Sequence, residues 1–309
     1  MIKLNCRRLL IDSEKLFFKK VKLNYASNPT AMTIGDSQLR IFFNSRDLQN
    51  RSSIYSIDFF PKTLEPDYES VLLQHLYGED SSYFSNGISN GQLFAFDGEM
   101  RLSVMGWKNY RDRHWEGRIG FIPVNADGNL SKLATRPWMD LDQDDPISLS
   151  YPAVLEDKDS KSIWYGSTYT WDAGNGEMVH VIKKAILSQD GNIIKSDKVM
   201  PYVLGTAQAF SRPATVKIGT EFLMAYSYRG NTTKYRIGFV KIGDTSTASH
   251  LSGIPPFLTS TNAWESEMVE YPSFFYFNDK LYMLYNGNSY GKSGIGIVQV
   301  VADKHVFSD

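Results

Sequence analysis

The chain has 309 residues, and its 33 Lys and Arg against 34 Asp and Glu leave a net charge of -1, which gives no electrostatic reason to expect nucleic acid or an anionic membrane as a partner. The single cysteine, Cys6, excludes an intrachain disulfide framework. No stretch approaches the roughly 20 consecutive apolar residues of a membrane span, and the first residues show no signal-peptide pattern, so we expect a soluble, cytoplasmic protein without membrane insertion.

One sequence unit recurs about every sixty residues along the chain. Four copies open on a residue followed by proline and a short apolar run, namely Asn28-Pro29-Thr30, Tyr151-Pro152-Ala153, Arg212-Pro213-Ala214 and Tyr271-Pro272-Ser273. The last three prolines are 61 and 59 residues apart, and the interval of 123 residues before them is two periods. A fifth copy is therefore expected near residue 90, with Asn90 in place of the proline.

Each opening predicts a first strand, which is followed by an aromatic-rich second run and then by a third. Three strands and a variable fourth are typical of a propeller blade. We predict an all-β fold, a five-bladed β-propeller that forms a single domain over residues 1–309, with 1–27 available as a closing strand. The predicted blades are approximately 28–80, 86–135, 150–200, 210–250 and 268–302. A pair of β-sandwiches is the alternative, but the even period leaves no linker at which to divide it.

In an antiparallel blade, the start of the first strand and the end of the second lie on the same face, beside the central channel. The residues at these positions form the predicted ligand-binding set: Asn28, Arg46, Arg51, Trp107, Tyr151, Trp171, Arg212, Arg229, Tyr271, Asn286 and Asn288. The alternative for each is that it fills the channel or satisfies a neighbouring backbone group. So many arginine and aromatic side chains favour a ligand, because a purely structural channel would favour small apolar residues.

The arginines of this set indicate the charge of that ligand. Guanidinium groups that converge on a cavity match the oxygens of phosphate or carboxylate. Arg212 is the strongest candidate, because it occupies the same position in its copy as Asn28, Tyr151 and Tyr271. The expected partner is therefore a sugar or glycan with an anionic group.

Several segments resemble uncharacterised propeller proteins related to glycoside hydrolase family 43. The segments that carry the resemblance are Ser27-Asn28-Pro29, Arg236-Ile237-Gly238, Trp264 to Met268, Glu270-Tyr271-Pro272 and Tyr282 to Asn288. The same superfamily contains arabinanases, xylosidases, invertases and mannoside phosphorylases. The resemblance implies a carbohydrate-active protein, often one of a bacterial surface-polysaccharide pathway.

The resemblance breaks at the hydrolytic carboxylates. Family 43 places an aspartate base before the first proline, a second aspartate in blade two, and a glutamate acid two residues before the proline of blade three. This sequence has Asn28, Ser89 or Asn90, and Ser150 at those places. Inverting hydrolysis needs one protonated and one ionised carboxyl group, and neither Asn nor Ser exchanges a proton at neutral pH. Ordinary family-43 hydrolysis is therefore disfavoured.

Three carboxylates remain on the expected face, and they are the candidate catalytic groups: Asp47, Glu267 and Glu270. Glu270 has the spacing to its proline that the hydrolases use in blade three. The alternative is that these groups stay ionised in ion pairs with arginines nearby.

No cofactor and no metal site are expected. The histidines, among them His180, show no metal-ligand spacing and no evident nucleophile partner, so they receive no role. The acidic run from Asp140 to Asp145 is interpreted as a solvated loop rather than a calcium site.

The leading functional hypothesis is a glycosidase-like protein that acts on or transfers an acidic or phosphorylated sugar. Hydrolysis, phosphorolysis and glycosyl transfer stay open as its reaction. The alternative is a non-catalytic sugar-binding or scaffold protein that has lost the glycosidase carboxylates.

Overall fold

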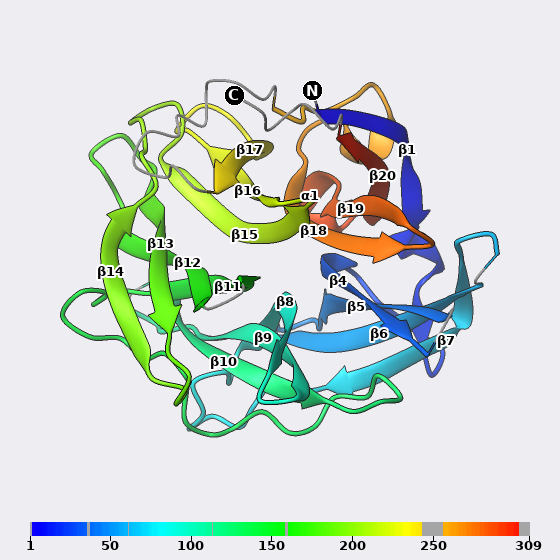
Figure 1. The fold of residues 1–309 in the computed structure, drawn as a ribbon, viewed down its shortest axis with the longest axis horizontal. Coiled ribbons are helices and arrows are strands. Elements are labelled where there is room, and N and C mark those ends of the chain that lie inside the picture. The colour runs from blue at the N-terminus through cyan, green and yellow to red at the C-terminus, as the bar shows by residue number, and fades with distance from the viewer. Residues whose placement is uncertain are drawn as a thin grey trace.

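The computed structural model describes residues 2–35, 38–60, 62–112, 114–157, 160–242 and 256–302. Their strands form antiparallel groups around a common centre (Figure 1). The first group contains β4 (Ser27–Ile34), β5 (Gln38–Arg46), β6 (Ser52–Phe60) and β7 (Glu65–His75), and the second contains β8 (Gly87–Phe96), β9 (Glu99–Lys108) and β10 (Glu116–Val124). The third contains β11 (Leu149–Asp157), β12 (Ser160–Thr170), β13 (Val179–Leu187) and β14 (Ile193–Val199). The fourth contains β15 (Ala209–Ile218), β16 (Glu221–Arg229) and β17 (Arg236–Ile242), and the fifth contains β18 (Glu270–Phe277), β19 (Lys280–Asn286), β20 (Ile295–Ala302) and β1 (Ile2–Ile11).

The first strands of these groups surround the centre. β4, β8, β11, β15 and β18 contact one another in that order, and β18 contacts β4 again, so they close a ring (Figure 1). The fold is an all-β propeller, as the sequence predicts. The count of five blades remains our interpretation of this ring.

The N-terminal strand completes the last group. β1 pairs antiparallel with β20, from Ile2 opposite Ala302 to Ile11 opposite Ile295. Residues from both ends of the chain therefore share one sheet.

Polar side chains at the ends of second strands join neighbouring groups. Asn286 Oδ1 accepts a hydrogen bond from the backbone N–H of Asn28 at 3.1 Å, and Asn44 Oδ1 accepts one from that of Asn90 at 2.9 Å. Ser227 Oγ accepts from the N–H of Tyr271 at 2.7 Å. These bonds satisfy backbone donors that the strand ladders leave free.

Each first strand carries a one-residue shift in register near its opening, as a β-bulge produces. The residue before the proline has a left-handed backbone in four groups, with φ of 50° at Asn28, 36° at Tyr151, 44° at Arg212 and 56° at Tyr271. A bulge re-aims the side chain it carries, and a proline there removes no ladder hydrogen bond. The repeat thus turns these four side chains out of the regular alternation.

The second group corrects one detail of the predicted repeat. Gly91, and not Asn90, stands where the other copies have proline, since it lies 62 residues after Pro29 and 61 before Pro152. A Cβ atom at Gly91 would lie 2.4 Å from the carbonyl oxygen of Pro152. The close approach of the next group explains why this position has no side chain.

Apolar side chains fill the space between adjacent groups. Ile41 and Phe43 of β5 belong to one buried cluster with Leu284 of β19, and Leu223 of β16 belongs to another with Met283 of β19. The two faces of β19 thus contribute to different clusters, as strand alternation requires.

The prediction that the acidic run is a solvated loop is wrong at Asp145. Its carboxylate is fully buried and accepts hydrogen bonds from Ser167 Oγ at 2.6 Å and Tyr165 Oη at 3.0 Å. Lys183 and Lys195 form ion pairs with it at 2.9 and 2.6 Å. Burial alone would raise the pKa of Asp145, but these partners lower it.

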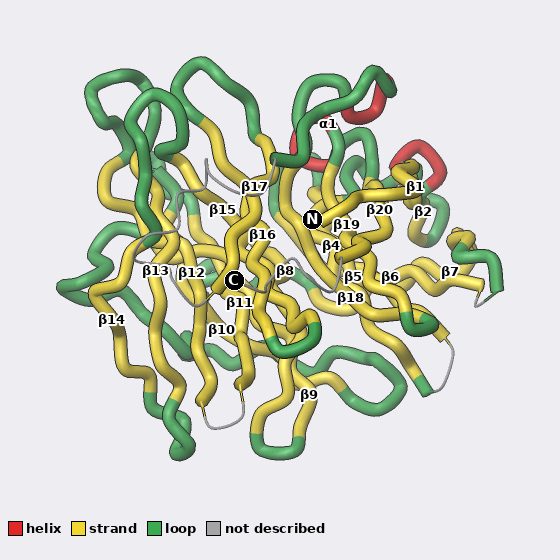
Figure 2. The backbone as a smooth tube through the Cα atoms, turned by 45° about the horizontal axis from the view of Figure 1, so that its top comes forward, coloured by secondary structure: helices red, strands yellow, loops and turns green. Residues whose placement is uncertain are grey.

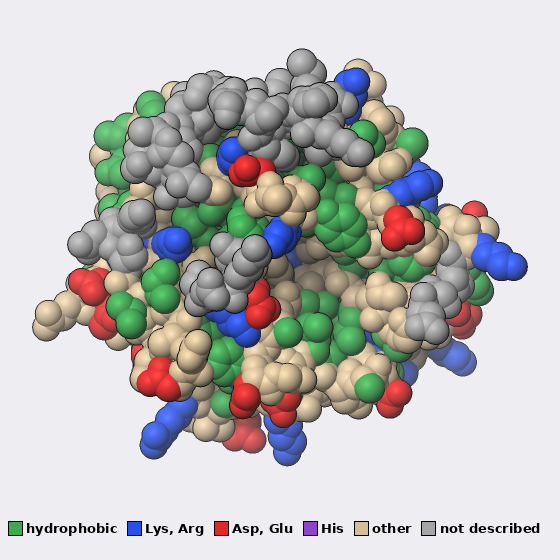
Figure 3. Space-filling view, in the orientation of Figure 1, with side chains coloured by type: hydrophobic (Ala, Val, Ile, Leu, Met, Phe, Trp, Pro, Cys, Tyr) green, Lys and Arg blue, Asp and Glu red, His purple; other side chains and the backbone are tan. Residues whose placement is uncertain are grey.

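Helix is minor among the described residues: η1 (Ser13–Lys15), η2 (Ala263–Glu265) and α1 (Asn288–Gly291) are short, and β2 (Phe17–Phe18) pairs with β3 (Val21–Lys22) (Figure 2). None of the helices in this part of the chain has the length and apolar character to cross a membrane. On the face drawn in Figure 3, basic and acidic side chains are interspersed rather than gathered by sign.

Candidate functional site

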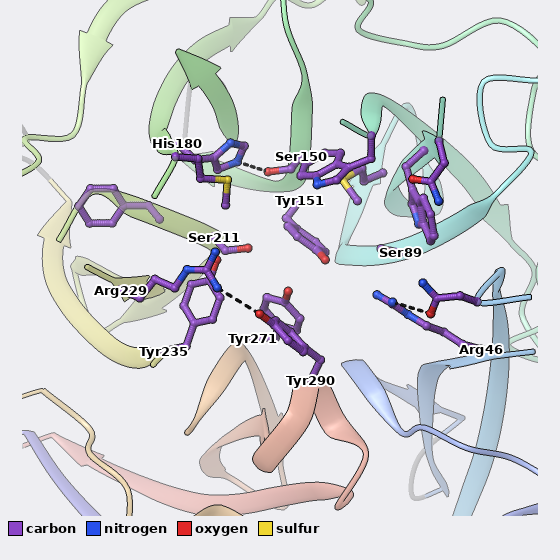
Figure 4. A pocket seen from close by; sticks show the side chains of 17 residues that line it. Arg46, Ser89, Ser150, Tyr151, His180, Ser211, Arg229, Tyr235, Tyr271 and Tyr290 are labelled. Atoms are coloured by element: carbon purple, nitrogen blue, oxygen red, sulfur yellow. Dashed lines mark hydrogen bonds between the residues drawn. The ribbon is translucent and has the colours of Figure 1, made fainter. Parts of the chain in front are cut away.

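A cavity of about 290 Å³ lies on the axis of the propeller, and every strand group contributes to its wall (Figure 4). We call it the axial cavity. Its lining residues are Arg46, Asn50, Ser89, Met105, Trp107, Asn109, Trp115, Ser150, Tyr151, Met178, His180, Phe210, Ser211, Arg229, Tyr235, Tyr271 and Tyr290. The volume is near the lower end of the range for small-molecule sites.

The repeat itself places part of this wall. Ser89, Ser150 and Ser211 stand two residues before the proline position of the second, third and fourth groups. Glu270 has the same position in the fifth group, and Ser27 has it in the first. Three serines from successive first strands therefore line one cavity.

Arg46 supplies a cation to the cavity wall. Its guanidinium donates to Asn50 Oδ1 at 2.9 Å and lies 5.7 Å from the ring centroid of Trp107 (Figure 4). Among the described residues, no carboxylate forms an ion pair with it. Most of its donors thus remain available to a ligand.

Arg229 is the second cation of the wall and is partly neutralised. It forms an ion pair with Glu177 at 2.9 Å, donates to Tyr290 Oη at 3.1 Å and lies 4.8 Å from the ring centroid of Tyr235. The two arginines approach the cavity from different sides (Figure 4). An anion in the cavity would lie between them.

Aromatic side chains, among them four tyrosines and two tryptophans, form much of the wall. The ring centroids of Tyr151 and Tyr271 are 5.1 Å apart, and those of Tyr235 and Tyr271 are 6.2 Å apart. Burial raises the pKa of all three phenols, so they stay protonated at neutral pH and can donate hydrogen bonds. Flat rings with polar tips suit the faces and hydroxyls of a sugar.

A hydrogen-bonded chain of three side chains lies at the third group. Ser150 Oγ is 2.6 Å from Nε2 of His180, and Thr168 Oγ1 is 2.7 Å from Nδ1 of the same ring. Burial, and then the charge of Arg229, lower the pKa of His180 to about 3. The imidazole is therefore neutral at physiological pH.

Arg212, which the sequence predicts to be the strongest anion ligand, has a structural position instead. Its guanidinium donates to the carbonyl oxygens of Asn90 at 2.8 Å, Gly91 at 3.1 Å and Pro272 at 3.3 Å. It also donates to Pro29 O and to Thr30 Oγ1. Only 1% of Arg212 is exposed, and it does not line the axial cavity. The side chain thus hydrogen-bonds to the first, second and fifth strand groups. Satisfying neighbouring backbone groups in this way is the alternative role considered for it in the sequence analysis.

Two of the predicted catalytic carboxylates lie outside the cavity, in ion pairs. Asp47 accepts from Nε of Arg51 at 2.8 Å, and Arg51 lies 4.1 Å from the ring centroid of Tyr77. Glu267 pairs with Lys234 and is more than half exposed. Asp47, Arg51 and Glu267 are therefore engaged in ion pairs, which is the alternative interpretation given for the carboxylates. None of the three lines the cavity, and their predicted assignment to the site is corrected accordingly.

Glu270 is the third predicted catalytic residue, and it is buried beside the cavity rather than in its wall. It is 0% exposed, and neither carboxyl oxygen forms a hydrogen bond of ordinary geometry with the part of the chain that the structure describes. Burial raises its pKa well above the usual value, although the adjacent Asn286 amide and the arginines oppose this. A protonated carboxyl is the state that a general acid needs, but access to a ligand is missing in this conformation.

The remaining predicted ligands have structural contacts. Asn28 and Asn286 are buried and form the bond that joins the fifth group to the first. Asn288 Oδ1 accepts from the backbone N–H groups of Glu267 and Met268. The ring centroids of Trp171 and Trp115 are 5.0 Å apart, and Trp115 lines the cavity whereas Trp171 does not. Of the predicted ligand set, five residues line the cavity: Arg46, Trp107, Tyr151, Arg229 and Tyr271.

Sequence reasoning missed His180, Tyr235 and Tyr290 as members of the wall. His180 lies in a third strand and Tyr235 directly before one, whereas most of the predicted set was taken from the starts of first strands and the ends of second strands. One signal in the repeat could have identified further lining residues. Ser150 and Ser211 both stand two residues before a proline, and this shared position could have been added to the predicted set.

Two relatives from Mycobacterium tuberculosis, the uncharacterized proteins Rv1502 (strain H37Rv) and MT1551 (strain CDC 1551), are each 32% identical to this chain over 280 residues. The matched region covers 89% of this chain and 92% of each relative. No family model matches the chain.

Solved structures with a similar fold include glycoside hydrolases. An alpha-L-arabinofuranosidase from Lactobacillus brevis has a TM-score of 0.67 at 13% identity, covering 95% of both chains. A thermostable family-43 glycoside hydrolase has a TM-score of 0.64 at 16% identity, covering 90% of both chains. The GH43_1 enzyme from Xanthomonas citri complexed with xylose has a TM-score of 0.59 at 13% identity, covering 96% of this chain and 89% of that one. These likenesses show the propeller fold.

Proposed function

Since this chain belongs to the family of the Mycobacterium tuberculosis proteins Rv1502 and MT1551, and folds like the family-43 glycoside hydrolases, we propose that it is a carbohydrate-active protein that binds an acidic or phosphorylated sugar in its axial cavity. One observation carries the proposal: two arginines stand in a wall of aromatic, serine, asparagine, methionine and histidine side chains, and Arg46 forms no ion pair with a carboxylate among the described residues.

The chemistry of the wall supports a sugar. Tyr151, Tyr271 and Trp107 offer rings and polar tips, and the three serines offer hydroxyls at the ligand's edge. The similar GH43_1 enzyme is complexed with xylose. Arg46 and Arg229 add the preference for a carboxylate or phosphate.

A second hollow, of about 620 Å³, supports a ligand longer than one sugar. It shares Arg229, Tyr235 and Tyr290 with the axial cavity and continues to Lys234 and Lys292. A chain of sugars, or a sugar joined to a phosphate, would extend along it. We therefore propose a glycan or an activated sugar as the ligand.

The chemistry of any reaction should differ from ordinary family-43 hydrolysis, because the sequence has no carboxylate at the positions expected from the resemblance, which are Asn28, Ser89 or Asn90, and Ser150. Glu270 remains the candidate acid on account of its raised pKa. From the sequence resemblance we also retain as proposals a surface-polysaccharide pathway and a cytoplasmic location. Phosphorolysis, which the sequence resemblance to the superfamily of the mannoside phosphorylases implies as an option, stays among the proposed reactions.

Ligand binding tests the proposal. Thermal shift and calorimetry are measured with uronic oligosaccharides, sugar phosphates and nucleotide sugars, each beside its neutral counterpart. We expect stabilisation by an anionic member and not by its neutral counterpart. Arg46→Gln should weaken that binding by about tenfold or more, since a hydrogen bond to a charged group contributes about 1.5–3 kcal/mol.

Arg51→Gln is the matched control, because Arg51 is close in sequence but pairs with Asp47 outside the cavity. It should leave the affinity unchanged. Equal binding of neutral and anionic sugars, or equal losses in the two variants, would contradict an anion site at Arg46.

The second candidate is a sugar-binding or scaffold protein without catalysis, which the buried, cavity-excluded position of Glu270 favours. Glu270→Gln separates the two. Loss of turnover with binding retained supports an enzyme that uses Glu270, whereas binding of the same sugar with no turnover in either form supports the second candidate.

A further inference from the structure

We propose that Ser150 and His180 form a nucleophile and general base that cleave an acyl ester carried by the sugar in the axial cavity. This activity goes beyond the proposed sugar binding, and its first test needs no sugar. Both side chains line the cavity, and Ser150 stands where the resemblance to family 43 implies the acid of those hydrolases.

The geometry of the pair is that of an activated hydroxyl. Ser150 Oγ lies 2.6 Å from Nε2 of His180, within reach for direct proton transfer. Thr168 Oγ1, 2.7 Å from Nδ1, can accept the proton on that nitrogen, which leaves Nε2 as the acceptor toward Ser150. A nucleophile, a base and a group that orients the base are the three parts of a serine-hydrolase centre.

The backbone makes room for this pair at Gly166. Ser150 lies opposite Gly166 in the β11–β12 ladder. A Cβ atom at Gly166 would lie 2.1 Å from Ser150 Oγ and 2.4 Å from His180 Nε2. Any larger residue would separate the two groups, so the glycine permits their contact.

The equivalent positions of the repeat lack this arrangement. Ser89 and Ser211 face the same cavity, but no histidine is bonded to either hydroxyl among the described residues. Ser27, in the first group, donates to the carbonyl oxygen of Asn44 instead. The activated hydroxyl is therefore specific to the third group.

Arg229 links the pair to the charge of the substrate. Its positive charge disfavours the imidazolium form of His180. A carboxylate or phosphate bound to Arg229 would offset that smaller contribution, while burial, the larger cause of the lowered pKa of His180, would remain. An anionic, O-acylated sugar is thus the substrate class that fits this cavity, with its anionic group at Arg229 and its ester at Ser150 and His180.

The reaction is written as two transfers. Ser150 Oγ bonds to the ester carbonyl carbon while its proton passes to Nε2 of His180. The carbon–oxygen bond to the sugar then breaks, and the sugar oxygen takes the proton from His180. Water next attacks the acyl-serine, a water proton returns through His180 to Ser150 Oγ, and a carboxylic acid leaves.

Covalent labelling tests the nucleophile directly. The full chain is incubated with a fluorophosphonate probe, in which Ser150 Oγ would bond to phosphorus and release fluoride, and the adduct is located by peptide mass spectrometry. We expect one adduct, on Ser150, which Ser150→Ala abolishes. Ser27→Ala is the matched control, since it removes a buried serine at the equivalent position outside the cavity, and it should label at the wild-type rate.

His180→Gln, with folding verified by circular dichroism, should slow labelling by about a hundredfold or more, because a general base contributes about 10²–10⁴. Hydrolysis of p-nitrophenyl acetate should fall in parallel. No adduct on the wild type, an adduct mainly on Ser89 or Ser211, or labelling that His180→Gln leaves unchanged would each overturn the proposal. Sugar binding by Ser150→Ala is measured separately, so failure of the nucleophile is distinguishable from failure of the sugar site.

Discussion

The third and fifth strand groups place different chemistry at the same position of the repeat. In the third group, Ser150 lies opposite Gly166, and the space above the glycine admits His180. In the fifth group, Glu270 lies opposite Asn286, whose Oδ1 accepts a hydrogen bond from the backbone of Asn28, and the carboxyl forms no hydrogen bond of ordinary geometry with the described residues. Ser150 lines the cavity and Glu270 does not, and the two positions also differ in the residue across the ladder.

The largest expected effect concerns His180 in acid. Its pKa rises from about 3 in the folded chain to about 6.5 on unfolding, so the unfolded chain binds more protons between these values. The free energy of unfolding should therefore fall as the pH falls from 6.5 to 3, by on the order of 4 kcal/mol in total. Urea unfolding from pH 4 to 7 measures it, and His180→Gln should flatten the slope. A variant with the wild-type slope would contradict a buried neutral imidazole.

The fifth group should show the opposite dependence. The folded pKa of Glu270 lies above the usual value of 4.5, so above that pH the folded chain binds more protons. The free energy of unfolding should fall as the pH rises from 4.5 toward the folded pKa, by at most about 1.4 kcal/mol per pH unit. Glu270→Gln should remove this loss in the same urea series. If the variant loses stability at every pH equally, the carboxyl is ionised in the folded chain.

The smallest expected effect concerns Gly166, the cross-strand residue in which the third group differs from the fifth. Gly166→Ala should reduce the free energy of unfolding by about 1–3 kcal/mol, because its Cβ atom overpacks against Ser150 and His180. Ser150→Ala in the same background removes the nearest atom and should recover part of the loss, as thermal unfolding of the double variant would measure. Strict additivity of the two changes would show that the clash lies elsewhere.

Much of the fold could be predicted, because a sixty-residue period and proline openings record the first strands directly. The same period placed Tyr151 and Tyr271 in the wall of the cavity. The period could not show that Arg212, at the same position of its copy, lies outside the wall. Its longer side chain reaches carbonyl oxygens of three other groups. Which way a side chain turns at a bulge depends on neighbours that are distant in sequence.

The site was less predictable for the same reason. Asp47 and Arg51 satisfy each other four residues apart, a local pairing that removes both from the cavity. The Ser150–His180 contact joins residues thirty positions apart and depends on the absence of a side chain at Gly166. Neither residue type nor spacing in the sequence records such an absence.

The pairing of β1 with β20 has a consequence for how the chain is made. During synthesis, β1 leaves the ribosome first and has no partner until the residues near Ala302 follow, so it remains an unprotected edge while the other strands form. Closing the ring joins Ile2 to Ala302, a pairing between residues distant in sequence, and such non-local contacts slow folding. A circularly permuted chain that begins at the Asn278-Asp279 turn would make β20 and β1 neighbours in sequence and allow that sheet to form locally.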